Sequence, residues 1–287
     1  MSKNLFNNKD LSSNLFQEYY NEVNNFFSNK TIEFPLYGIH KQIMVFYLAL
    51  VRFYKINLVI ESGVGMGYST KYLIDFSEKF NIQTVSIDLN INQLYYKHRN
   101  VEFKKNSLSS FEEGDGFLKV SELVMQNKDK KIALFLDGPK HLEAISLHDI
   151  CCLLNKNVIF SFIDDILVNS NSFKSLKNYN YFYIYDLLNK EKIFRENKKK
   201  VLESYFRLKN KKNKSEAELK SQTRISNLFV KREVILWNKT KNYLPIFRIL
   251  FSPIIFFFLY KLKFSSKIIL FFLKLFRKVN FFLNKQE

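Results

Sequence analysis

The chain has 287 residues, 47% of them hydrophobic, enough to bury a core in one large domain or in one domain with appendages. Lysine and arginine (45) outnumber acidic residues (27), and the net charge of +18 allows nucleic acid, an anionic membrane or an acidic polymer as partner. The adjacent Cys151 and Cys152 exclude a disulfide framework and a zinc-finger spacing, and the first ten residues lack the apolar run of a signal peptide. Both observations predict a cytoplasmic protein.

Residues 1–54 are predicted to form an N-terminal helical cap. Apolar residues recur at helical spacing within 11–27, with polar residues between them. This helix is expected to lie over the core or over the mouth of an active site. After the breaks at Pro35 and Gly38, residues 39–54 predict a second, strongly apolar helix that leads into the next strand.

The stretch at 57–70 reads NLVIESGVGMGYST. Its first residues predict a buried strand that ends at Glu61, and Ser69 and Thr70 suit the first turn of a helix. Between them lie three of the seven glycines of the chain, Gly63, Gly65 and Gly67. Clustered glycines indicate a tight turn that a ligand can approach closely. A strand, a glycine loop and a helix N-terminus in this order predict a nucleotide-type pocket.

The glycine spacing disfavours NAD, because the third glycine of a dinucleotide fingerprint would fall at Tyr68. An acid two residues before G-x-G-x-G instead resembles the first motif of class I S-adenosylmethionine (SAM)-dependent methyltransferases. This resemblance implies that the loop passes under the methionine part of SAM and that Glu61 helps hold its amino group. It also implies a second acid at the end of the next strand, which accepts both ribose hydroxyls.

Residues 83–88, QTVSID, supply that strand and end in Asp88, about 20 residues further on. Residues 101–105 predict a short third strand, whose end would lie near the adenine and bring Asn106 or Ser107 to it. The predicted cofactor-binding residues are therefore Glu61, Gly63, Gly65, Gly67, Ser69, Asp88 and Ser107.

Strands and helices continue to alternate along the chain. Helices are predicted at 116–125 and 141–154, strands at 131–137 and 158–163, and β-prone segments at 181–185 and 230–237. The alternation predicts right-handed crossovers and an α/β fold with a Rossmann-like, doubly wound, mostly parallel sheet. The whole domain is predicted to span 55–238, and its charged range 187–229 is predicted to be a helical insertion.

Asp137, Asp164 and Asp165 are predicted at the carboxyl ends of two adjacent strands, about 5 Å apart. Carboxylates this close would raise one another's pKa unless a cation neutralised them, so the arrangement invites Mg²⁺ or Mn²⁺. Such an ion could hold two oxygens of a diol and lower the pKa of the hydroxyl to be methylated.

Three short motifs are similar to the metal-dependent O-methyltransferases, and most closely to the macrocin-type sugar O-methyltransferases. The motifs are Glu61, Ser62, Gly63 and Val64 at the glycine loop, Asp137 and Gly138 after the fourth strand, and Asp164 and Asp165 after the fifth. The resemblance covers roughly residues 57–170. It implies that Asp137, Asp164 and Asp165 are metal ligands.

The chain departs from that family after Gly138 and before the fifth strand. Pro139, Lys140 and His141 stand where the family has an acidic and aromatic run, and 155–157 replace a glycine pair. Lys140 or His141 could act as the base or bind an acidic sugar, and the alternative is that each is a solvent-facing residue at a helix start. The predicted catalytic residues are Asp137, Lys140 and His141.

Residues 239–287 form a basic, apolar C-terminal tail that carries half of the net charge. Wound as a helix, its second half places Lys267, Lys274, Lys278 and Lys285 within about 20° of one line, and apolar residues rich in phenylalanine cover most of the rest. This pattern predicts helices that lie at an anionic membrane surface. Packing on the domain or on a partner subunit, and a transmembrane hairpin, stay open.

The sequence as a whole predicts a SAM-dependent O-methyltransferase that acts on a sugar hydroxyl. The substrate is expected in a surface polysaccharide or lipid-linked glycan, because the tail predicts attachment to the inner face of the cell membrane. One alternative is an RNA methyltransferase, against which the concentration of charge in an apolar tail argues. Another is a non-catalytic membrane-bound assembly protein with the same fold. Homo-oligomerisation is left open.

Overall fold

The computed structural model describes residues 13–28, 39, 41–65, 67–89, 107–167, 176, 179, 181–184 and 231–238. The helices of these ranges are α2 (Asn14–Ser28), α3 (Lys41–Phe53), α4 (Tyr68–Phe80), α5 (Gly116–Gln126) and α6 (Leu142–Leu154). The strands are β1 (Leu58–Ser62), β2 (Gln83–Asp88), β3 (Ser109–Glu113), β4 (Ile132–Leu136), β5 (Val158–Leu167), β6 (Tyr181–Tyr183) and β7 (Lys231–Trp237). The predictions for 101–105, for the insertion 187–229 and for the tail 239–287 lie outside the described residues.

All seven strands form one sheet in the order β3-β2-β1-β4-β5-β7-β6. The first five are parallel, and β7 runs antiparallel to its neighbours β5 and β6. This arrangement confirms the predicted Rossmann-like, mostly parallel sheet. The strand order reverses between β1 and β4, and in such sheets ligands bind in the crevice beyond the carboxyl ends of the strands at this switch point.

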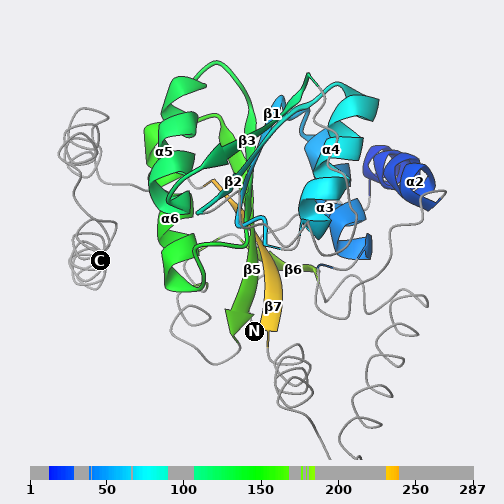
Figure 1. The fold of residues 1–287 in the computed structure, drawn as a ribbon. Coiled ribbons are helices and arrows are strands. Elements are labelled where there is room, and N and C mark those ends of the chain that lie inside the picture. Colours follow the sequence, from blue (N-terminus) through cyan, green and yellow to red (C-terminus); the bar gives the residue numbers. More distant parts are fainter. Residues whose placement is uncertain are drawn as a thin grey trace, which may run out of the picture.

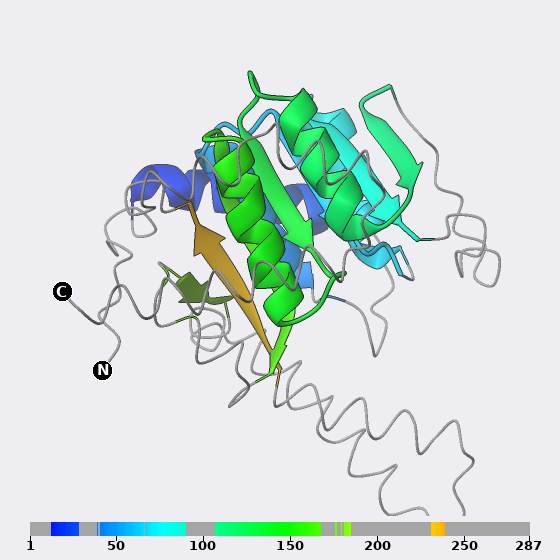
Figure 2. The same cartoon turned by 90° about the vertical axis from the view of Figure 1, so that its left-hand side faces the viewer.

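Helices cover both faces of the sheet. Figure 1 shows α5 and α6 on one face and α3 and α4 on the other, and in Figure 2 α5 and α6 lie in front of the strands. Successive strand residues divide between the two layers, because side chains alternate across a sheet. In β4, for example, Leu134 packs with α5 and α6, whereas Phe135 packs with α3 and α4. A strand with two buried faces explains the unbroken apolar run of β4.

The predicted N-terminal helix is confirmed as α2, which lies over the core. Phe16 of α2 packs edge-on against Phe46 and Phe53 of α3, with ring centroids 5.5 and 5.8 Å apart. Helix α3 is therefore covered by α2 and by the sheet, and nine consecutive residues of α3 are buried. Burial on all sides explains why the sequence of α3 is apolar around its whole circumference.

Two strands differ from their predicted positions. The strand that pairs with β2 is β3, which begins at Ser109, four residues after the predicted third strand ends. Strand β5 continues to Leu167, so Asp164 and Asp165 lie within the strand and not after it. No helix in the described ranges is long and apolar enough to cross a membrane.

Candidate active site

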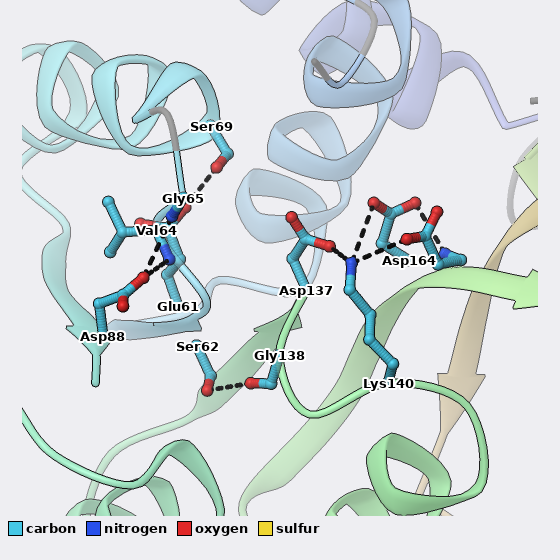
Figure 3. Close-up of polar contacts among 11 residues, drawn as sticks. Glu61, Ser62, Val64, Gly65, Ser69, Asp88, Asp137, Gly138, Lys140 and Asp164 are labelled. Carbon is cyan, nitrogen blue, oxygen red and sulfur yellow. Dashed lines mark hydrogen bonds and ion pairs between the residues drawn. The ribbon is translucent and has the colours of Figure 1, made fainter. Parts of the chain in front are cut away.

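The loop between β1 and α4 has the backbone conformation that its glycines predict. Gly63, Gly65 and Gly67 have φ angles of 90°, 53° and 78°, in the region that side chains disfavour. Gly63 is also confined in space, because a Cβ atom there would lie 2.6 Å from the backbone nitrogen of Gly138. The glycine loop therefore rests directly on the chain that leaves β4. Ser62 adds a hydrogen bond from its hydroxyl to the carbonyl of Gly138 (Figure 3).

Asp88, at the end of β2, is tied to the same loop. Its Oδ2 accepts hydrogen bonds from the backbone N–H groups of Val64, at 2.9 Å, and Gly65, at 3.1 Å (Figure 3). The backbone N–H of Gly63 donates to the carbonyl of Ile87 at 2.9 Å. Asp88 thus holds the glycine loop in shape at the place where the sequence predicts a ribose-binding acid. That predicted role stays a prediction.

Glu61 is fully buried beneath the loop and accepts three hydrogen bonds from hydroxyl groups of the chain. Ser69 and Thr70 of α4 donate at 2.5 and 2.7 Å, and Ser86 of β2 donates at 2.6 Å. Both carboxylate oxygens are engaged, so Glu61 joins strand β1 to α4 and β2. Its predicted contact with the amino group of SAM, and that of Ser69 with SAM, remain predictions.

The pKa of Glu61 is raised by burial; its three hydroxyl partners oppose the rise and the nearby charge of Asp88 adds to it. The unfolded chain therefore loses this proton at lower pH than the folded chain does. Consequently the free energy of unfolding is expected to fall as pH rises above the ordinary glutamate pKa of 4.5. Glu61→Gln should make this fall shallower, leaving the part that comes from the raised pKa values of Asp137 and Asp164. Urea unfolding of both proteins between about pH 4 and 7 would measure the difference.

Glu78→Gln is the matched control, because Glu78 is an exposed acid on the neighbouring helix α4. This variant retains the buried Glu61, so it should keep the part of the fall that Glu61 causes. If the profile of Glu61→Gln ran parallel to that of the wild type, the buried carboxyl would not titrate differently in the folded and unfolded chains.

Strands β4 and β5 bring the three predicted metal ligands together. Asp137, Asp164 and Asp165 each offer a carboxylate oxygen, and these oxygens lie within 4.8 Å of one another. The three side chains keep solvent exposures of 34%, 21% and 20%, so the cluster is open on one side. Three carboxylate oxygens of this spacing fit a hard divalent cation such as Mg²⁺ or Mn²⁺.

A β-bulge explains how two consecutive residues can face the same site. Neighbouring residues of a regular strand point to opposite faces of the sheet. Here Ile163 pairs with Val234 of β7 and Ile166 with Arg232, so β5 has one residue more than its partner over this interval. Asp165 takes a φ of 62°, and its N–H donates to Oδ1 of Asp164 at 2.8 Å. The bulge thereby turns both carboxylates toward Asp137.

Lys140 places its ammonium among the three carboxylates. Nζ forms an ion pair with Oδ1 of Asp137 and lies 2.9 Å from Oδ2 of Asp165 and 3.9 Å from Oδ2 of Asp164. Figure 3 shows the ammonium between Asp137 and Asp164. The sequence predicted a role for Lys140 as base or anion-binding group, but not its position inside the carboxylate cluster.

Burial and mutual repulsion govern the charges of the cluster. Burial, followed by the neighbouring carboxylates Asp137 and Asp165, raises the pKa of Asp164 well above its usual range, although Lys140 opposes the rise. Burial also raises the pKa of Asp137. For Lys140, burial lowers the pKa but the three carboxylates raise it more. A cation at this place therefore favours the ionised carboxylates, whereas burial and mutual repulsion favour their protonation.

Two other predicted residues have unexpected positions. His141 precedes α6 with a φ of 56°, and its Nδ1 is buried with no hydrogen-bond partner among the described residues.

Ser107 lies before β3, next to Leu108, whose carbonyl accepts a hydrogen bond from the backbone N–H of Thr84 at the start of β2. It thus precedes the amino end of β3, whose first residue, Ser109, is already four residues, or about 13 Å of strand, from the level of Asp88. The prediction that Ser107 lines the cofactor pocket is corrected accordingly.

Leu89 is a candidate that sequence reasoning missed. It follows Asp88 directly, and 71% of its surface is exposed, the largest exposure among the large apolar residues of the described ranges. The signal in the sequence was an apolar residue immediately after the acid that ends β2. An exposed leucine beside Asp88, the predicted ribose-binding acid, offers an apolar surface of the kind that suits a nucleobase.

No family model matches the chain, and a search of curated proteins finds no similar sequence. Among solved structures, it is similar to the Podospora anserina methyltransferase PaMTH1 bound to S-adenosylhomocysteine (SAH), with 10% identity and a TM-score of 0.37 over 78% of this chain and 88% of that one. A candidate caffeoyl-CoA O-methyltransferase from Staphylococcus aureus matches with 13% identity and a TM-score of 0.36, over 80% and 99%. A candidate O-methyltransferase from Klebsiella pneumoniae matches with 11% identity and a TM-score of 0.35, over 79% and 90%. Similarity at 10–13% identity and TM-scores of 0.35–0.37 assigns no function to this chain.

Proposed function

We propose that this chain is a SAM-dependent O-methyltransferase whose acceptor oxygen is held at the carboxylate cluster. One observation carries the proposal: at the switch point of the sheet, the glycine loop packs against the backbone of Asp137 and Gly138, where the carboxylate cluster begins. A Cβ at Gly63 would lie 2.8 Å from the backbone carbon of Asp137, the first carboxylate of the cluster. A cofactor held on the loop would therefore have its reactive end beside the three carboxylates.

The cofactor is proposed to lie along the carboxyl ends of β1 and β2. Asp88 accepts the ribose hydroxyls, Leu89 packs against the adenine, and the glycine loop passes under the methionine part. Glu61 keeps the loop and the start of α4 in register through its three hydroxyl partners. This assignment uses one end of the sheet, where parallel strands leave room for a ligand.

Asp137, Asp164 and Asp165 are proposed to hold Mg²⁺ or Mn²⁺, which when bound lowers the pKa of an acceptor hydroxyl. In the transfer, the acceptor oxygen bonds to the methyl carbon, and the carbon–sulfur bond breaks with its electron pair staying on sulfur, leaving SAH. The hydroxyl proton passes to solvent water at the open side of the cluster. Lys140 stays protonated, because burial lowers its pKa less than the three carboxylates raise it, and its positive charge stabilises the developing alkoxide.

A sugar hydroxyl in a surface polysaccharide or lipid-linked glycan is the proposed acceptor. Two sequence features support it: the motifs shared with macrocin-type sugar O-methyltransferases, and the basic apolar tail at 239–287, which suits the inner face of an anionic membrane. Lipid-linked glycans are accessible at that surface, so an enzyme attached there would meet them.

Calorimetric titration of the full chain with SAH, in Mg²⁺ and then in EDTA, tests the proposal. Binding with a micromolar dissociation constant is expected in both buffers, with a heat that depends on the metal. Asp164→Ala should abolish the metal dependence and change the SAH affinity by less than about threefold, because Asp164 lies beyond the glycine loop. Absence of SAH binding to the wild type would overturn the proposal and favour the non-catalytic assembly protein. Loss of both properties in Asp164→Ala would make this residue structural.

A further inference from the structure

The ammonium of Lys140 holds the same oxygens that a divalent ion would need. It forms ion pairs with Oδ1 of Asp137 and Oδ2 of Asp165, and Oδ2 of Asp164 lies 3.9 Å from it. The carboxylate oxygens of the cluster lie within 4.8 Å of one another. A divalent ion takes oxygens at roughly 2.0–2.6 Å, so an ion at the centre of the cluster would sit almost on top of the ammonium. The space therefore holds one cation at a time.

We propose that Lys140 is a built-in counter-ion that competes with the divalent metal for the three carboxylates. It keeps the cluster assembled in the metal-free protein, and it leaves the cluster when the metal binds. This inference rests on the metal site of the proposed function, but not on the cofactor or the acceptor.

The position of Lys140 suits such an exchange. It lies three residues after Asp137, in the connection from β4 to α6, and its side chain is 39% exposed. A lysine ammonium is a compact point charge on a flexible four-carbon stem, so it can move into solvent without a change of the backbone. The exposed side of the cluster gives it a direction in which to leave.

The exchange couples the metal to the surface that meets the acceptor. With the metal absent, the ammonium is neutralised by carboxylates. With the metal bound, it is displaced to the mouth of the same cluster and adds a free positive charge there. The acceptor-facing surface would thus attract an anionic or oxygen-rich acceptor only after the metal is in place, which sets an order of binding.

Titration of the full chain with MnCl₂ alone, by calorimetry, tests the competition. Lys140→Met removes the charge but keeps a long side chain, and it should bind Mn²⁺ about tenfold tighter, because affinity at such sites follows the net ligand charge. Lys140→Arg keeps the charge and should show no tightening. Lys119→Met is the matched control, since Lys119 forms its ion pairs with Glu112 and Glu122, 2.8 and 3.2 Å away, and not with the carboxylates of the cluster. Its Mn²⁺ affinity should equal that of the wild type.

Equal or weaker Mn²⁺ binding by Lys140→Met would overturn the proposal, as would equal tightening by Lys140→Arg. If no Mn²⁺ bound to any of these proteins, both the proposed competition and the proposed metal site would be wrong. The methyltransferase assignment would still be decided separately, by the SAH titration.

Amine labelling of the wild type covers the case in which Lys140→Met does not fold. Mass spectrometry would follow the modification of Lys140 by an amine-reactive reagent, with and without Mn²⁺. Faster labelling with Mn²⁺ is expected because the ammonium is displaced, and unchanged or slower labelling would contradict the exchange. Labelling of Lys119 provides the internal reference.

Discussion

Replacing Gly63 by alanine is expected to lower the free energy of unfolding by about 3 kcal/mol or more. Two effects add at this residue. Its φ of 90° is unfavourable for any residue with a Cβ, and the new methyl group would lie 2.6 Å from the nitrogen of Gly138 and 2.8 Å from the carbon of Asp137. Both are backbone atoms, which cannot turn aside as a flexible side chain can. The loop, the end of β4 and Asp137 must therefore move together.

Gly65→Ala separates the two effects. Gly65 also has a positive φ, 53°, but an added Cβ there has no atom within 4 Å among the described residues. Its substitution should cost only the backbone strain, about 1–2 kcal/mol. Urea unfolding of the three proteins would measure both losses. Equal losses at Gly63 and Gly65 would contradict the close contact between the glycine loop and the chain that leaves β4.

The parts of the fold that the sequence predicts well are those with a strong local signal. Strands β1, β2 and β4 lie within two apolar layers. Strands β1 and β2 end in a polar residue at the carboxyl edge, and β4 is followed by one, Asp137. Their boundaries agree with prediction to within about two residues. The assembly of Asp137 with Asp164 also follows from local signals, because parallel neighbouring strands place their ends together.

The third strand was misplaced because its signal is weak. Strand β3 reads SSFEE, lies at an edge of the sheet and buries only Ser109. Without a buried face it has no alternation of apolar and polar residues, whereas 101–105 have a pattern closer to that of a strand. With a third strand at 101–105, Ser107 is expected just after the strand, at the ligand-binding edge of the sheet. Because the strand is in fact 109–113, Ser107 comes before it and lies at the opposite edge.

The bulge in β5 could not be read from the sequence because its cause is not local. Residues 158–163 carry the apolar signal of the strand, and two aspartates normally end one. Strand β7, about 70 residues further along the chain, pairs with β5 beyond them and extends it to Leu167. The position of the Lys140 side chain also depends on tertiary structure, because the bulge in β5 turns the carboxylates that it pairs with toward β4.

The roles of Glu61 and Asp88 show the limit of motif reasoning. The acid before the glycine loop was assigned to the cofactor, but in the structure its oxygens are used by Ser69, Thr70 and Ser86. Asp88 has a structural contact as well, because it accepts two N–H groups of the loop. The position of each acid follows from the motif, whereas its partners depend on residues that the motif does not include.

Replacing Asp88 by alanine is expected to weaken SAH binding about 100-fold, the largest effect on affinity among the substitutions considered. A carboxylate that accepts two ribose hydroxyls contributes about 1.5–3 kcal/mol per bond, and a loss of about 3 kcal/mol corresponds to about 100-fold. The loop amides of Val64 and Gly65 lose their acceptor at the same time, so the loop is less well ordered for the ligand. Calorimetric titration with SAH would measure the loss.

Glu113→Ala is the matched control, because Glu113 is an exposed acid that pairs in register with Asp88 at the same edge of the sheet. It should bind SAH as the wild type does. The 2′-deoxy analogue of SAH distinguishes the two roles of Asp88: it should bind the wild type more weakly than SAH, but bind Asp88→Ala as well as SAH does. If the variant still discriminated between the two ligands, Asp88 would act through the loop alone and the ribose would be held by another group.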